Sequence, residues 1–147
     1  MKRFNFRFEK VLSYRRHQEK GKQRELAQVR NREEKQKKEI HGIVKDHSNQ
    51  QQSQKSQLVG TINPLRMTAF SRYYLKLKQL EFIGRETLKT IKKEVEEKRG
   101  KLVEATKQRK IYEKLKEKHL EEYTVEYNLM LQKENDEIGL KVFARQK

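Results

Sequence analysis

A single proline, Pro64, constrains this chain more than any other residue. It lies in a short break between two long segments, residues 8–60 and about 66–138, which contain no other proline. Proline breaks helix interiors, so its absence allows each segment to form one very long helix. Asn63 can cap a second helix whose first residue is Pro64, where the missing N–H costs nothing. The chain is therefore predicted to turn once, near residue 64.

Apolar residues recur along one face of each segment. In the first, Leu12, Leu26 and Ile40 are fourteen residues apart, and Val29 and Ile43 follow the last two by three. These are two positions of one heptad frame, whose other members are polar: Glu19, Lys22, Glu33, Gln36 and His47. The second stripe is fuller: Phe70, Tyr74, Leu77, Leu88, Ile91, Val95, Leu102, Ala105 and Tyr112. The pattern predicts an all-α fold, two long helices in an antiparallel coiled-coil hairpin.

One coiled-coil domain over residues 1–147 is expected. Helix 1 is predicted at about 5–60, the turn at about 61–65 and helix 2 at about 66–138, overhanging the first helix, with a frayed tail at 139–147. Charged residues make up 39% of the chain and apolar residues 33%, a composition that also suits disorder. The helical period of the apolar residues favours long helices.

Several classes of protein are excluded by what the sequence lacks. It has no cysteine, no run of 18 apolar residues and no continuous apolar signal region, so we expect a soluble chain in a reducing cytoplasm. The four histidines lack the spacing of a helical zinc site and are interpreted as solvated. We predict no enzyme activity, no cofactor, no metal and no small-molecule ligand.

The net charge of +16 is unevenly distributed. Residues 15–38 carry ten Lys and Arg against four Glu, and residues 85–110 carry ten against five, whereas residues 117–137 carry seven acids against two lysines. A turn near residue 64 places the two basic segments side by side, and Gly42 nearly opposite Gly84. A cationic surface of this kind binds nucleic acid or ribosomes, or an acidic protein surface or ring lumen. A third possibility is a structural coiled coil that self-associates through its seam.

Aromatic residues gather in two places. The same register brings Phe4, Phe6 and Phe8 near Leu120 and Tyr123. Just beyond the turn, residues 70–83 contain eight aromatic or aliphatic side chains: Phe70, Tyr73, Tyr74, Leu75, Leu77, Leu80, Phe82 and Ile83. A two-helix seam buries about two residues in seven, so part of this group must face outward. It marks either a partner site or extra packing near the turn.

Both ends of the sequence resemble the flagellar export protein family FliJ. The N-terminal residues that carry the resemblance are Phe4, Phe6, Phe8, Glu9, Lys10, Val11, Leu12 and Arg15, with Glu19 and residues 25–27. The C-terminal ones are Arg109, Lys110, residues 113–117, Tyr123 and residues 136–138. Gly21 and Phe8 depart from the family pattern. Stalk proteins of virulence secretion systems are similar, so both systems stay open here.

The resemblance implies a non-enzymatic stalk protein that binds and stimulates a hexameric flagellar export ATPase. It further implies contacts with the export-gate membrane protein and with substrate chaperones, and a cytoplasmic location, peripherally associated with the inner membrane at the flagellar base. We assign ATPase-ring contact to Phe4, Phe6, Phe8, Arg15, Arg16, Arg109, Lys110, Lys114 and Tyr123. Gate or second-partner contact is assigned to Phe70, Tyr73, Tyr74, Leu77, Leu80 and Ile83.

Overall fold

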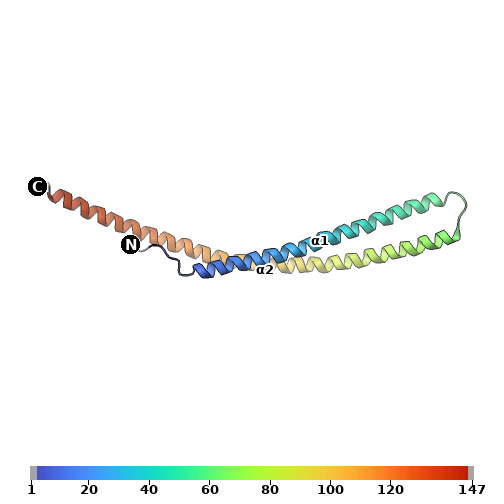
Figure 1. Cartoon of the computed structure of the whole chain (residues 1–147), viewed down its shortest axis with the longest axis horizontal. Coiled ribbons are helices and arrows are strands. Elements are labelled where there is room, and N and C mark those ends of the chain that lie inside the picture. Colours follow the sequence, from blue (N-terminus) through green and yellow to red (C-terminus); the bar gives the residue numbers. More distant parts are fainter. Residues whose placement is uncertain (1–2, 146–147) are drawn as a thin grey trace. The chain divides into compact units, whose positions relative to one another are not determined.

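The computed structural model describes residues 3–145 and consists of two helices, α1 (Glu9–Gln57) and α2 (Pro64–Arg145), joined by a turn (Figure 1). The turn has the expected chemistry. Oδ1 of Asn63 accepts a hydrogen bond from the Leu65 N–H at 3.0 Å, and Pro64 is the first helical residue. Gly60 has a φ of 128°, which only glycine adopts without strain. The predicted all-α fold of two long helices is confirmed.

The helix ends differ from those expected from the sequence, because α1 is shorter and α2 is longer. α1 is shorter than expected at both ends and runs from Glu9 to Gln57: residues 3–6 have no regular secondary structure, and residues 7–8 form a turn. The structure continues α2 through residues 139–145, where a frayed tail was expected. The last two residues of that expected tail, 146 and 147, lie outside the described part of the chain.

The chain divides into two compact units. The terminal unit combines residues up to Gly21 with residues from Val103 onward, and the turn unit is Lys22–Leu102. Both helices pass through both units, so a single coiled-coil domain stays a prediction.

Within each unit the two helices pack antiparallel. In the turn unit Arg32 pairs with Glu94 at 2.6 Å and Lys98 with Glu25 at 2.8 Å. In the terminal unit, too, residues later in α2 lie beside residues earlier in α1. These pairings confirm the predicted antiparallel packing, within a few residues of the predicted register.

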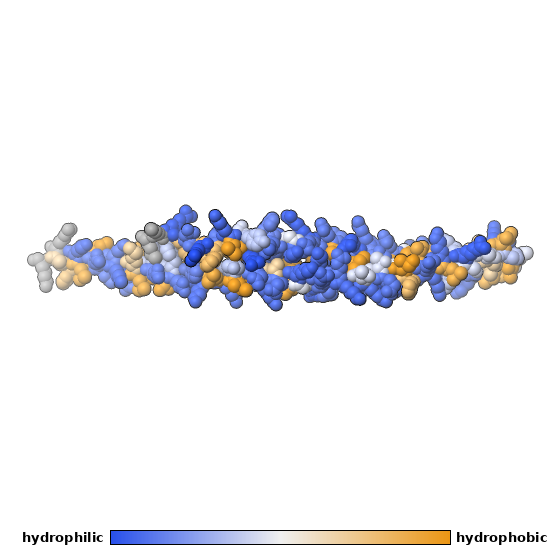
Figure 2. Space-filling view, turned by 90° about the horizontal axis from the view of Figure 1, so that it is seen from below, coloured by the Kyte–Doolittle hydropathy of each residue, from blue (hydrophilic) through white to orange (hydrophobic). Residues whose placement is uncertain are grey.

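The core is a thin seam. In the turn unit it centres on Leu26, Val29 and Val95, flanked by Ile91 and Leu102. Leu12 is fully buried in the terminal unit. Every apolar heptad position predicted for α1 lies on this seam, which confirms the period. On the face shown in Figure 2, apolar residues form separate patches surrounded by hydrophilic residues.

Ion pairs occupy several polar positions of the seam. Glu25 accepts hydrogen bonds from Lys98 at 2.8 Å and from Lys22 at 2.9 Å. These two ammonium groups lower the pKa of Glu25 from its ordinary 4.5 to about 2. A half-exposed pair of this kind contributes little stability, but it lets the seam continue where no apolar residue is available.

Gly84 marks a close approach between the helices in the turn unit. A Cβ atom there would lie 3.1 Å from Cγ1 of Ile40 and 3.3 Å from Nε2 of Gln36, whose amide donates to the Gly84 carbonyl at 3.3 Å. Gly42, expected opposite, has no neighbour within 4 Å of its Cβ position. The close approach is therefore glycine against isoleucine.

This difference predicts opposite behaviour for two helical glycines. Gly100→Ala should raise the free energy of unfolding by up to about 1 kcal/mol, because alanine favours helix and its Cβ meets open space. Gly84→Ala should gain clearly less, because its Cβ presses on Ile40 and Gln36. Urea unfolding of both variants beside the parent measures this, and equal gains would contradict the close approach.

Candidate functional site

An aromatic cluster occupies the terminal unit, where residues 3–8 run along α2. The ring centroids of Phe4 and Tyr123 are 5.5 Å apart, and those of Phe8 and Tyr112 are 6.2 Å apart. Phe6, only 5% exposed, lies edge-on to the His119 ring at 5.8 Å. The predicted proximity to Tyr123 is confirmed for Phe4, whereas the ring partners of Phe6 and Phe8 on α2 are His119 and Tyr112. We call Phe4, Phe6, Phe8 and Tyr123 the aromatic collar.

Backbone hydrogen bonds connect the collar to the start of α1. The carbonyl of Phe6 accepts from the Glu9 N–H at 3.1 Å, and that of Phe8 from the Leu12 N–H at 2.9 Å. Helix starts leave such N–H groups without helical partners, so these bonds help to hold the first turn. Lys116 then pairs with Glu9 at 2.8 Å across the two helices. The backbone carbonyls of these phenylalanines therefore support the first turn of α1, while their side chains cover α2.

Basic residues behind the collar divide into two groups. Arg109 pairs with Glu19 at 2.5 Å and also with Glu113, while Arg16 reaches Glu113 at 3.1 Å. Arg15 hydrogen-bonds Gln18 at 3.0 Å. These arginines are already engaged within the chain.

The other two predicted ring contacts, Lys110 and Lys114, are exposed. In the described part of the chain neither forms an ion pair. Both are therefore available to a partner.

The pKa directions in this unit follow from the same pairs. Glu113, followed by Glu19, raises the pKa of Arg109 above its ordinary value. Burial alone would raise the pKa of Glu113, but hydrogen bonds from Arg109 and Arg16 lower it overall. Both groups therefore keep their charge across the physiological range. The sequence pattern assigns neither Glu113 nor His119 to this site, although Glu113 is among the residues that carry the family resemblance.

Beyond the collar, α2 continues without a covering helix. Residues 124–144 are all exposed. Apolar side chains nevertheless recur there and together exceed what a solvated helix needs: Val125, Tyr127, Leu129, Met130, Leu131, Ile138, Leu140, Val142 and Phe143, each at least 38% exposed. We call residues 124–144 the overhang. Its surface has the composition of a contact surface.

A second apolar group lies in the turn unit on α2. Leu77 is buried at 5% exposure and Phe70 and Tyr74 are half-buried, so these three pack in the seam. Tyr73, Leu80 and Ile83 are between 42% and 51% exposed, and Leu75 and Phe82 are 64% and 67% exposed. The prediction that part of this group must face outward is confirmed, and the structure identifies which part.

The histidines correct one expectation. His17 and His41 are exposed, whereas His47 and His119 are half-buried. The ring centroids of His47 and Tyr74 are 4.4 Å apart, and the His119 ring lies edge-on to that of Phe6 at 5.8 Å. Heptad position explains this, because both fall on the seam. No group of three metal-ligating side chains occurs within residues 3–145. In the same residues neither helix has a stretch apolar enough to serve as a membrane span.

Comparison with known proteins assigns a family. The sequence model of the flagellar FliJ protein family matches residues 4–147, nearly the whole chain. No curated protein and no solved structure gives a significant match.

Removing one buried collar ring tests how the collar supports α1. Phe6→Ala should release residues 3–8 from α2 and raise amide hydrogen exchange at Glu9 and Leu12 by about tenfold or more, the factor that 1.4 kcal/mol of lost protection gives. Asn5→Ala, at an exposed neighbouring position, is the matched control. Unchanged exchange in the Phe6 variant would show that the collar does not hold the helix start.

Proposed function

The chain belongs to the flagellar FliJ family, and from this premise we propose that it is the central-stalk and coupling protein of the flagellar export ATPase. Family membership gives it a flagellar export-related role among the non-enzymatic components of that apparatus. In our proposal it binds and stimulates the hexameric ATPase through the terminal unit. It contacts the export gate and substrate chaperones through the turn unit.

The observation that carries the proposal is the overhang, which is apolar on two faces. At 3.6 residues per turn, Tyr127, Leu131 and Ile138 fall on one side and Val125, Leu129 and Phe143 on the other. One partner helix covers only one side, whereas a helix apolar on several sides is normally enclosed. The lumen of a hexameric ring provides such an enclosure.

Charge refines the contact. Lys110 and Lys114 offer unpaired cations to acidic ring loops, with Arg15, Arg16 and Arg109 behind them. The acidic residues of segment 117–137 would face basic groups deeper in the ring. Such complementarity speeds encounter and fixes register more than it adds affinity, so association should weaken with salt. Phe4, Phe6, Phe8 and Tyr123 would form the apolar rim.

The turn unit is assigned to the second partner because Tyr73, Leu80 and Ile83 are exposed apolar residues on one helix. Phe70, Tyr74 and Leu77 support them from within the seam. A gate protein in the inner membrane would hold this chain peripherally at the cytoplasmic face.

The net charge of +16 favours one competing function, binding of nucleic acid or ribosomes. The two functions separate in one experiment. ATP hydrolysis by the cognate export ATPase is measured with and without this chain at two salt concentrations, beside a duplex-DNA binding titration. We expect stimulation at about one chain per hexamer and weak DNA binding. No stimulation together with tight, steeply salt-dependent DNA binding would replace the stalk by the competing function.

Variants then locate the ATPase contact. Phe4→Ala/Phe8→Ala should weaken co-sedimentation with the ATPase by about tenfold, the loss expected for two aromatic anchors. Tyr73→Ala/Leu80→Ala, exposed positions of the turn unit, should leave it unchanged; they are better suited than Leu77, whose burial confounds binding with folding. Equal loss from both pairs would contradict the division of contacts.

A further inference from the structure

In the turn unit, α2 carries a second heptad stripe beside the seam. The seam residues are 70, 74, 77, 81 and 84. One position earlier in each case lie Ala69, Tyr73, Lys76, Leu80 and Ile83. Four of these five are apolar, and the spacing of four, three, four and three is that of a helix-packing face. Tyr73 and Leu80 are each 42% exposed and Ile83 is 51% exposed, so α1 does not cover this stripe.

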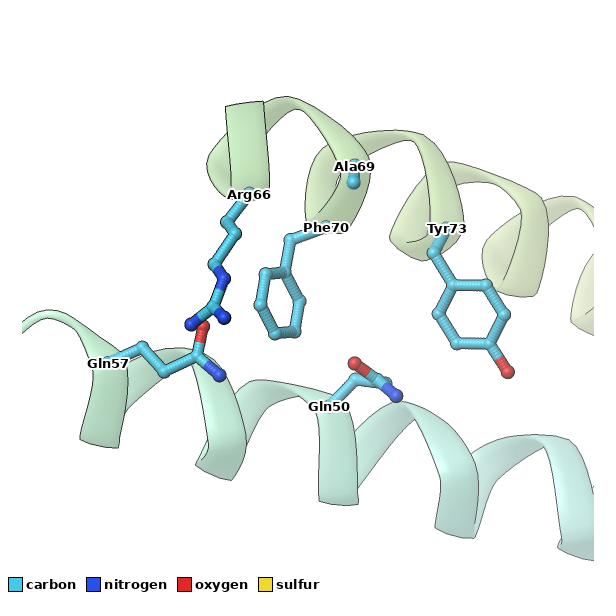
Figure 3. Close-up of a pocket in the computed structure, with 6 residues that line it drawn as sticks. All are labelled: Gln50, Gln57, Arg66, Ala69, Phe70 and Tyr73. Atoms are coloured by element: carbon cyan, nitrogen blue, oxygen red, sulfur yellow. The ribbon is translucent and has the colours of Figure 1, made fainter. Parts of the chain in front are cut away.

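A groove lies where this stripe meets α1. It has a volume of about 360 Å³ and is lined by Gln50, Gln57, Arg66, Ala69, Phe70 and Tyr73. Figure 3 shows the Phe70 ring between the two helices, with Arg66 and Gln57 on one side of it and Gln50 between Phe70 and Tyr73 on the other. The groove thus combines an aromatic floor with amide and guanidinium donors.

The α1 side of the groove explains why it stays open. Residues 46–57 contain no apolar side chain, so α1 presents only polar groups to the aromatic residues of α2 here. In the described residues, the polar contacts that cross between the helices end at Gln36 and Gly84. A third helix could therefore pack against α2 and α1 together without displacing a polar contact between them.

Charge identifies the kind of helix that fits. Residues 66–85 contain five basic side chains and one acid, Glu81, which pairs with Arg85 at 2.7 Å. Arg66, Arg72 and Lys76 form no ion pair in the part of the chain that the structure describes. Unpaired cations beside an exposed apolar stripe suit a partner with acidic side chains flanking an apolar face.

We propose that the stripe, together with the groove that Ala69 and Tyr73 line at its turn end, binds one amphipathic helix with acidic flanks, as the third helix of a local three-helix bundle. The inference deepens the second-partner contact of the proposed function and rests on it. The opposite flank of the seam carries Ser71, Leu75, Lys78, Phe82 and Arg85, of which only two are apolar. The partner helix therefore packs on the Tyr73 side and not on the Leu75 side.

The test uses the full chain and two designed three-heptad peptides. Both have leucine at heptad positions a and d; one has glutamate and the other lysine at e and g. The acidic peptide should bind at least about tenfold more tightly than the basic one at low salt, and the difference should shrink as salt screens the charges. Comparable binding of the two peptides would overturn the charge assignment.

Matched variants locate the site. Leu80→Ala/Ile83→Ala should weaken binding of the acidic peptide by about tenfold or more. Leu75→Ala/Phe82→Ala, on the same helix and 64% and 67% exposed, should leave it unchanged. Because all four positions are exposed, folding is retained. Equal effects of the two pairs would overturn the assignment of the docking face. If the chain self-associates and Leu80→Ala/Ile83→Ala abolishes that self-association, the occupant of the face is a second copy of the chain.

ATPase stimulation separates this inference from the function on which it rests. Leu80→Ala/Ile83→Ala should stimulate the export ATPase as the parent does while losing the peptide. If the parent chain fails to stimulate the ATPase, the proposed function fails whatever the peptides do. If stimulation is intact and neither peptide binds, the groove inference alone is contradicted.

Discussion

The structure depends on a seam in which a few buried aliphatic side chains alternate with ion pairs. Leu12, Leu26 and Val29 are buried, whereas the heptad positions between them hold Glu19 and Lys22. Such a seam aligns two helices but buries little apolar surface. It also leaves many apolar residues of α2 outside the pairing. Some of those residues form the stripe beside the seam, and others form the overhang, which extends past the start of α1. Both surfaces are available for partners.

Much of this architecture could be predicted from spacing alone. Pro64 and Asn63 identify the turn, and the fourteen-residue interval between leucines fixes which face of α1 is buried. Partner choice among charged residues could not be predicted, because several acids lie within reach of each cation until the register is known. Glu19 with Arg109, and Glu25 with Lys98, emerge only from the packed helices. The same holds for the half-buried His47 and His119.

The two candidate surfaces differ in physical character, which supports different partners for them. The terminal unit offers an aromatic collar, the exposed Lys110 and Lys114, and a helix apolar on two faces, features suited to enclosure. The turn unit offers a shallow groove with one apolar stripe and unpaired cations, features suited to a single helix. Exposed apolar residues were predictable near the turn, but the stripe became definable only when the seam residues beside it were known.

The central claim is that the terminal unit, and not the turn unit, contacts the export ATPase. The most direct measurement incorporates a photo-crosslinking amino acid at Leu131 in the overhang or at Leu80 in the turn unit, and irradiates the complex with the hexameric ATPase and ATP. We predict crosslinks to the ATPase from position 131 and none from position 80. Crosslinks to the ATPase from position 80 with none from position 131 would contradict the account.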